Sequence, residues 1–104
     1  MKITNEQKIK QIIMKPKAIC FCPLGDDWYT NEFEIIMYPD KYFPDYCDLE
    51  KFLNETVRGK SLIIEDAVEK VYKYLNDTYK PYELEVTSRV NDVTSHSPVE
   101  VKKY

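Results

Sequence analysis

The chain has 104 residues, is 43% hydrophobic and carries a formal net charge of −3. This length fits a single small α+β domain spanning 1–104, with a thin margin of stability that assembly into an oligomer would increase. The acidic balance excludes a general attraction to nucleic acid, and no apolar run approaches the roughly 18 residues of a membrane span. The first residues also lack the apolar core of a signal peptide, so we expect a cytoplasmic protein without a membrane partner.

Residues 1–7 precede the first expected strand and form an end that can fray. The first 17 residues contain five lysines and one acid, Glu6. The lysines are Lys2, Lys8, Lys10, Lys15 and Lys17. We interpret them as solvent-exposed lysines that keep a sheet edge from pairing with other strands. The alternative is an N-terminal arm that contacts phosphate groups.

Two strands are expected next. Residues 8–22 predict one edge strand that Pro16 interrupts, and residues 23–27 predict a loop. Residues 31–38 alternate, with Phe33 on one face and Glu34 on the other. Apolar residues also occur on the second face of residues 31–38, which suggests that a neighbouring subunit covers it.

Two helices follow. The first is expected from about Asp48, with an apolar stripe that ends before Arg58 and Gly59, a pair suited to a left-handed cap. The stripe comprises Leu49, Phe52, Leu53 and Val57. The second helix is expected to be capped by Ser61, to carry Glu65 in its first turn and to close within residues 76–81.

Residues 83–90 alternate strictly between apolar or small and charged or polar side chains, and residues 98–103 give a last strand. The predicted order is therefore ββααββ. This order favours an α+β fold in which an antiparallel sheet has two helices on one face.

Cys22 is the first candidate for chemistry, since it lies where an apolar strand meets a polar loop. A thiol at such an edge can be partly exposed, and Asp26 or Asp27 could shuttle a proton to a substrate nitrogen. The alternative is a small buried hydrophobe, the commonest state of a free cysteine. An odd number of cysteines, three, argues against a disulfide framework.

Three other features remain open. Glu65 is either a surface acid favoured by the helix dipole or a pocket carboxylate that accepts paired hydrogen bonds from a planar ring. His96 is the only histidine and lies in a polar turn, so a hydrolase triad is disfavoured. A zinc site would need Cys20, Cys22, Cys47 and His96 to assemble over long range, so we expect no metal.

Four collinear motifs together resemble a known family. They are Cys22-Pro23, Tyr38-Pro39-Asp40, residues 58–66 at the start of the second helix, and residues 81–86. The chain resembles the 7-cyano-7-deazaguanine (preQ0) reductases, QueF, and still more the QueF-like archaeosine-forming amidinotransferases of the tunnelling fold (T-fold). The resemblance covers residues 18–103.

The resemblance implies that the protein acts on a nitrile, and it implies which residues carry out the reaction. Cys22 matches the family's nucleophile, which adds to the nitrile of preQ0 as a covalent thioimide. Glu65 matches the glutamate that anchors the base, and Asp27 is the candidate proton donor. The amidinotransferases act on preQ0 in tRNA with ammonia as co-substrate and need no other cofactor, whereas the reductases use NADPH. The family also implies a homo-oligomer with sites between subunits, and it makes Arg58, Lys60 and the N-terminal lysines candidate tRNA contacts.

The chain departs from the family at three places. Residues 45–50 do not match the reductase segment associated with NADPH, which disfavours a reductase. The family's aspartate lies seven residues beyond the nucleophile, where this chain has Tyr29, and the family histidine before the helix glutamate is Ile64. Two alternatives follow: a non-catalytic T-fold domain that binds a purine-like ligand, and a nucleic-acid-binding module without chemistry.

Overall fold

The main sheet is built around one long strand, β4 (Asp27–Tyr38), which pairs with three other strands. On one side it pairs with β2 (Ile12–Met14) and β3 (Lys17–Cys22), and on the other with β6 (Glu83–Val90). The outer neighbour of β6 is β7 (Val99–Lys103), and all these pairings are antiparallel. The computed structural model describes all 104 residues.

The predicted interrupted edge strand is confirmed for residues 12–22, because β2 and β3 pair with successive parts of β4 and are separated by Lys15 and Pro16, whereas residues 8–11 are not in a strand. Proline cannot donate to a strand ladder, which explains the break. The hairpin strand β4 begins earlier than predicted, at Asp27, because Trp28, Tyr29 and Thr30 continue the pairing with β3.

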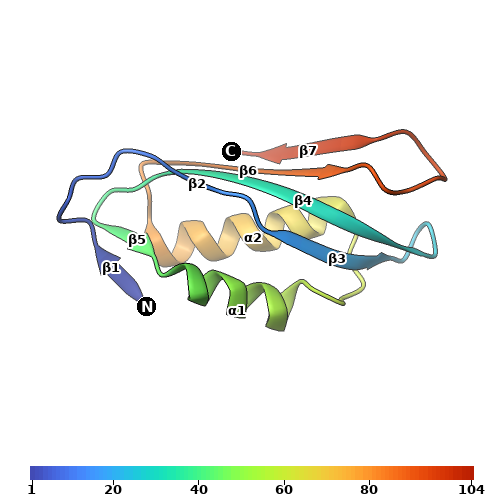
Figure 1. The fold of residues 1–104 in the computed structure, drawn as a ribbon, viewed down its shortest axis with the longest axis horizontal. Helices are drawn as coiled ribbons and strands as arrows, with labels where there is room; N and C mark the ends of the chain where they lie inside the picture. Colours follow the sequence, from blue (N-terminus) through green and yellow to red (C-terminus); the bar gives the residue numbers. More distant parts are fainter.

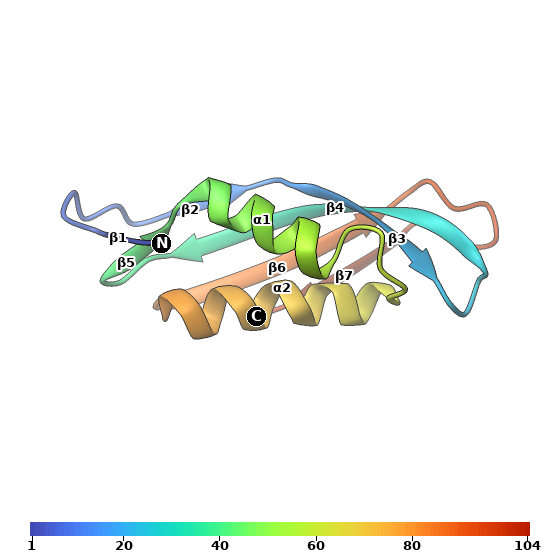
Figure 2. The ribbon, with the colours of Figure 1, turned by 90° about the horizontal axis from the view of Figure 1, so that it is seen from below.

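Helices α1 (Tyr46–Thr56) and α2 (Ile64–Tyr79) lie on the same face of the sheet, as Figures 1 and 2 show. Phe52 of α1 stacks on Tyr74 of α2, with ring centroids 4.0 Å apart. The α+β class, the ββααββ order and the placement of both helices on one face are therefore confirmed. Neither helix is long and apolar enough to cross a membrane.

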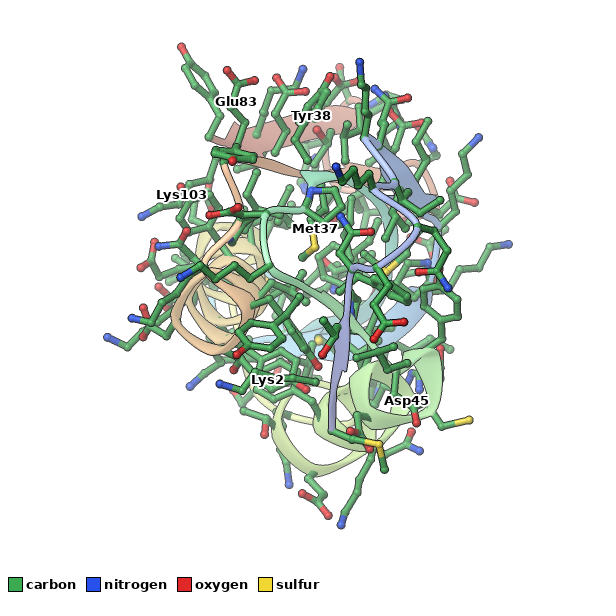
Figure 3. All side chains as sticks on the ribbon, turned by 90° about the vertical axis from the view of Figure 1, so that its left-hand side faces the viewer. Lys2, Met37, Tyr38, Asp45, Glu83 and Lys103 are labelled. Atoms are coloured by element: carbon green, nitrogen blue, oxygen red, sulfur yellow. The ribbon has the colours of Figure 1, made fainter.

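The core lies between the sheet and the helices. Phe33, Ile35 and Met37 are at most 2% exposed, as their alternation predicts. Figure 3 shows Met37 between sheet and helices and its neighbour Tyr38 on the outer side. The core continues through the inward residues of both helices and of β6, which are Leu49, Leu53, Val57, Ala67, Val68, Val71, Leu75, Tyr79, Leu84, Val86 and Val90.

The N-terminal residues differ from the expected frayed end. β1 (Lys2–Thr4) pairs antiparallel with β5 (Tyr42–Pro44) in a second, two-stranded sheet. Asn5 fixes the turn that follows, because its side-chain amide donates to the carbonyls of Ile9 and Asp40 and accepts from the Ile9 amide. The Asn5 side chain thus fixes the turn after β1, a segment that has little apolar periodicity.

The helix ends differ in part from the predictions. Helix α1 begins two residues early, because the Asp45 side chain caps it by accepting from the Cys47 amide at 2.8 Å. Gly59 has the predicted left-handed backbone, with φ +74°. The predicted cap Ser61 is wrong, because Ser61 forms a parallel bridge with Phe21 and α2 begins after Ile63, without a side-chain cap.

The bridge at Ser61 also protects a sheet edge. The Phe21 amide donates to the Lys60 carbonyl, and the Leu62 amide donates to the Phe21 carbonyl. The linker between the helices therefore runs along the outer edge of β3 and satisfies groups that an edge strand leaves unpaired. It also fixes where α2 begins relative to Cys22.

Candidate active site

Three segments meet at one end of the sheet. β6 runs antiparallel to β4 and its end pairs with the first half of β4, where Arg89 lies opposite Glu32, so the β3–β4 turn and the β6–β7 loop project from the same end (Figure 1). The linker that pairs with Phe21 brings the start of α2 to the same end. The three segments surround a cavity of about 670 Å³.

Cys22 is the last residue of β3 and lines this cavity. Its side chain is half-buried, and its Sγ accepts a hydrogen bond from the Gly25 amide at 3.4 Å. The predicted nucleophile therefore has access to a cavity and a donor in its own turn.

Asp27 lines the same cavity and is the direct cross-strand partner of Cys22. Directly opposed residues of an antiparallel pair project their side chains on the same face, with Cβ atoms about 4.5–5.5 Å apart. The exposed carboxylate accepts from the Trp28 amide at 2.8 Å through one oxygen, so its other oxygen is free to handle a proton.

Tyr29 occupies the position seven residues beyond Cys22, and its role in the structure is to support the cavity wall. It is 2% exposed, lines the cavity, and donates its hydroxyl to the Leu62 carbonyl at 2.5 Å. Burial, followed by the nearby Cys20, raises the pKa of Tyr29, so the phenol stays neutral. Tyr29 thus joins the cavity wall to the segment that leads into α2.

Glu65 lies in the first turn of α2, is exposed and lines the cavity. The apolar side chains of Ile63 and Ile64 line it beside the carboxylate. The three residues that the sequence nominates, Cys22, Asp27 and Glu65, are therefore brought together in one cavity.

His96 is a further residue of this cavity that the sequence analysis did not place there. It lies in the loop between β6 and β7, and its Nδ1 is 2.7 Å from the carbonyl oxygen of Ser97. The signal was topological: in a ββααββ fold both hairpin turns emerge at the same end, so a polar residue in the last turn can face the end of β3.

The other two cysteines do not share the site. Cys20 is fully buried, its Sγ donates to the Val57 carbonyl at 3.2 Å, and burial raises the pKa of its thiol. Cys47 is exposed in α1, away from the cavity. No group of three or more histidine, cysteine or acidic side chains in the chain is arranged to hold a metal ion.

A larger hollow, of about 980 Å³, lies at the opposite end of the molecule. Lysines and tyrosines line it, among them Lys8, Lys10, Tyr38 and Tyr82, but no cysteine or histidine does. Because this hollow offers neither a thiol nor an imidazole, we assign the candidate chemistry to the smaller cavity.

No known family profile matches the chain, and no curated protein matches it. Among solved structures, the chain is similar to the crystal structure of the archaeosine synthase QueF-Like in the apo form. The TM-score is 0.81 at 16% sequence identity, over 91% of this chain and 92% of the other. The chain therefore has the fold of the archaeosine synthase QueF-Like.

Proposed function

We propose that this chain is a QueF-like, tRNA-modifying amidinotransferase that converts the nitrile of preQ0 in tRNA to the formamidine of archaeosine. One observation carries the proposal: Cys22, Asp27 and Glu65 line a single cavity. They do so in a chain with the fold of an archaeosine synthase.

The first half of the reaction is capture of the nitrile. The Cys22 sulfur bonds to the nitrile carbon, one π bond of the C≡N group breaks, and the thiol proton ends on the nitrogen to give a thioimide. Asp27 carries that proton, since its side chain shares a face with Cys22. Covalent capture divides one difficult step into two easier ones.

The second half replaces sulfur by nitrogen. Ammonia adds to the thioimide carbon, the C–S bond breaks, and the sulfur regains a proton as the formamidine leaves. Neither half changes the oxidation level of the carbon, so no NADPH is used. In support, residues 45–50, which correspond to the reductase segment for NADPH, lie at the start of α1 and contribute nothing to the cavity lining.

Glu65 anchors the base. The cavity falls within the roughly 300–1,000 Å³ range of small-molecule sites, and its lining combines apolar side chains with a few polar ones. A carboxylate on such a wall accepts two hydrogen bonds from adjacent N–H groups of a planar purine-like ring, which fixes orientation.

The tRNA would contact lysines outside the cavity. Lys60 is exposed in the linker beside β3 and is a candidate phosphate contact. Arg58 is a poorer one, because its guanidinium donates to the Lys17 carbonyl and to Glu50 and Asn54, so it braces α1 against β3.

A second candidate function is binding of a purine-like ligand without turnover. Tyr29 and Ile64 favour it, because they occupy the positions of a family aspartate and histidine. In this case Glu65 would hold the ring while Cys22 stayed unreactive.

Turnover separates the two. With preQ0-containing tRNA and an ammonium salt, nucleoside analysis should show archaeosine for the wild type and none for Cys22→Ala. We expect Asp27→Asn to slow formation by roughly 10²-fold, the usual scale of a lost proton-transfer group. We expect Glu65→Gln chiefly to raise KM. Full activity in Cys22→Ala would refute covalent catalysis, and tRNA binding without any product would favour the binding function.

A further inference from the structure

The loop between β6 and β7 brings an imidazole to the cavity, and the mechanism above gives it no part. Building on the proposed function, we propose that His96 is the acid–base residue of the second half-reaction. It takes a proton from the attacking ammonia and returns it to the Cys22 sulfur.

The loop is held against the sheet. The Asp92 carboxylate accepts a hydrogen bond from the Thr30 amide of β4 at 3.0 Å. Val93 is half-buried and packs against the core, and Val99 starts β7 on the far side. His96 lies exposed between these two fixed points and lines the cavity.

The hydrogen bond of the ring selects its tautomer. Nδ1 lies 2.7 Å from the Ser97 carbonyl oxygen, which can only accept, so Nδ1 carries the hydrogen. In the neutral ring Nε2 is then the free base. A backbone carbonyl that orients a histidine in this way leaves the other nitrogen for proton transfer.

The segments that line the cavity suggest which side serves nitrile capture and which side serves the attack of ammonia. Cys22, Asp27 and the amide of Gly25 all come from the β3–β4 hairpin, which equips that side for capture. Glu65 comes from α2, and His96 is the titratable side chain that the β6–β7 loop contributes. A ring held by Glu65 and bonded to Cys22 leaves the loop side for the incoming nucleophile.

The proton balance is closed without another reactant. Ammonia forms a C–N bond with the thioimide carbon as its N–H bond breaks toward Nε2 of His96. The C–S bond then breaks, and the imidazolium returns the proton to sulfur. The titratable groups that face His96 across the cavity are Cys22, Asp27, Tyr29 and Glu65, and Asp92 lies in its own loop.

The experiment separates capture from release. Wild type, His96→Gln and Thr94→Ala are first incubated with preQ0-containing tRNA without ammonia, and the adduct is measured by intact mass. Ammonium is then added, and the loss of the adduct is followed in time. We expect all three proteins to form the adduct and His96→Gln to release it roughly 10²-fold more slowly. Thr94→Ala is the matched control, because Thr94 is an exposed residue of the same loop outside the cavity lining, and it should release the adduct at the wild-type rate.

A pH series at constant free ammonia gives a second readout that a structural role would not move. The wild-type release rate should depend on pH, because a base must take the proton from ammonia, and His96→Gln should lose that dependence. Release at the wild-type rate in His96→Gln would overturn the assignment, as would loss of adduct formation in that variant alone. If the wild type itself forms no adduct, the proposed function fails and this assignment fails with it.

Discussion

Cys20 and Cys22 lie two residues apart on the same face of β3, yet their surroundings differ. Cys20 is fully buried, donates to the Val57 carbonyl and is touched by the Asn31 amide, and burial raises the pKa of its thiol. Cys22 lies half-buried at a cavity, beside an amide donor. Position along one strand therefore separates a thiol packed in the core from a thiol that faces a cavity.

Thiol labelling tests this difference. In the native protein we expect a thiol reagent to modify Cys22 and the exposed Cys47 and to spare Cys20 until the chain unfolds. Mass spectrometry of digested protein identifies the labelled residues, and Cys47→Ser gives a control in which Cys22 alone reacts. Labelling of Cys20 at the same rate as Cys22 in native protein would contradict the burial described here.

Local sequence signals were sufficient to nominate some of the residues that line the cavity, but not others. Cys22, Asp27 and Glu65 stand next to local signals: a strand end, a polar turn and a helix start. Tyr29 reads locally as an ordinary strand residue. Its structural role in the cavity wall depends on the hydrogen bond to the Leu62 carbonyl, 33 residues away in the sequence. His96 likewise reaches the cavity only through the pairing of β6 with β4, which no local pattern around it encodes.

At the level of elements, the Asp92 carboxylate is a polar anchor of the β6–β7 loop. Burial opposes ionisation of Asp92, but the hydrogen bonds from Thr30 outweigh it, so the pKa of Asp92 is lowered from 3.8. Because the folded state holds the ionised form better, this contribution is present above the ordinary pKa and is lost as pH falls through the lower folded value.

We expect Asp92→Asn to destabilise the protein by about 0.5 kcal/mol near neutral pH, a small value because the carboxylate is largely exposed. The difference from wild type should shrink at a pH of about 3. Urea unfolding at both pH values measures it. Because the loop carries His96, the same variant should also slow adduct release. A destabilisation that grows on acidification would contradict the anchor.

The elements also show what pattern can and cannot predict. Strict alternation located β6 and the core face of β4, and the pair Arg58 and Gly59 located the end of α1. The prediction that Ser61 caps α2 was wrong because Ser61 forms a backbone bridge with Phe21. That bridge depends on how the linker lies against β3, which the local sequence does not reveal. β1 escaped notice because three residues and an asparagine turn carry little periodic signal.

At the scale of the molecule, the face of the sheet opposite the helices retains apolar side chains. Ile13, Ile19 and Trp28 are 51%, 54% and 53% exposed, and Ile36 lies beside Ile13. The edge strands β2 and β7 have backbone groups that other strands could pair with, whereas the linker between the helices covers the outer edge of β3. Both features agree with the expected homo-oligomer, in which this face or these edges meet another copy.

We expect light scattering to give a mass of at least two chains for the wild type. Trp28→Lys, which places charge on the apolar face, should shift the mass toward one chain, and Glu85→Lys on the same face serves as the control for charge alone. A wild-type protein that stays monomeric over a wide concentration range would contradict assembly and with it a site shared between subunits.

The central claim is that Cys22 captures a nitrile, and intact mass spectrometry tests it most directly. Wild type, Cys22→Ala and Cys47→Ala are each mixed with preQ0, as the free base and then within tRNA, before the protein is weighed. We predict that wild type and Cys47→Ala each gain the mass of one base or modified RNA, since addition releases nothing, and that Cys22→Ala gains none. No gain in wild type with either form, or an equal gain in Cys22→Ala, would contradict the account.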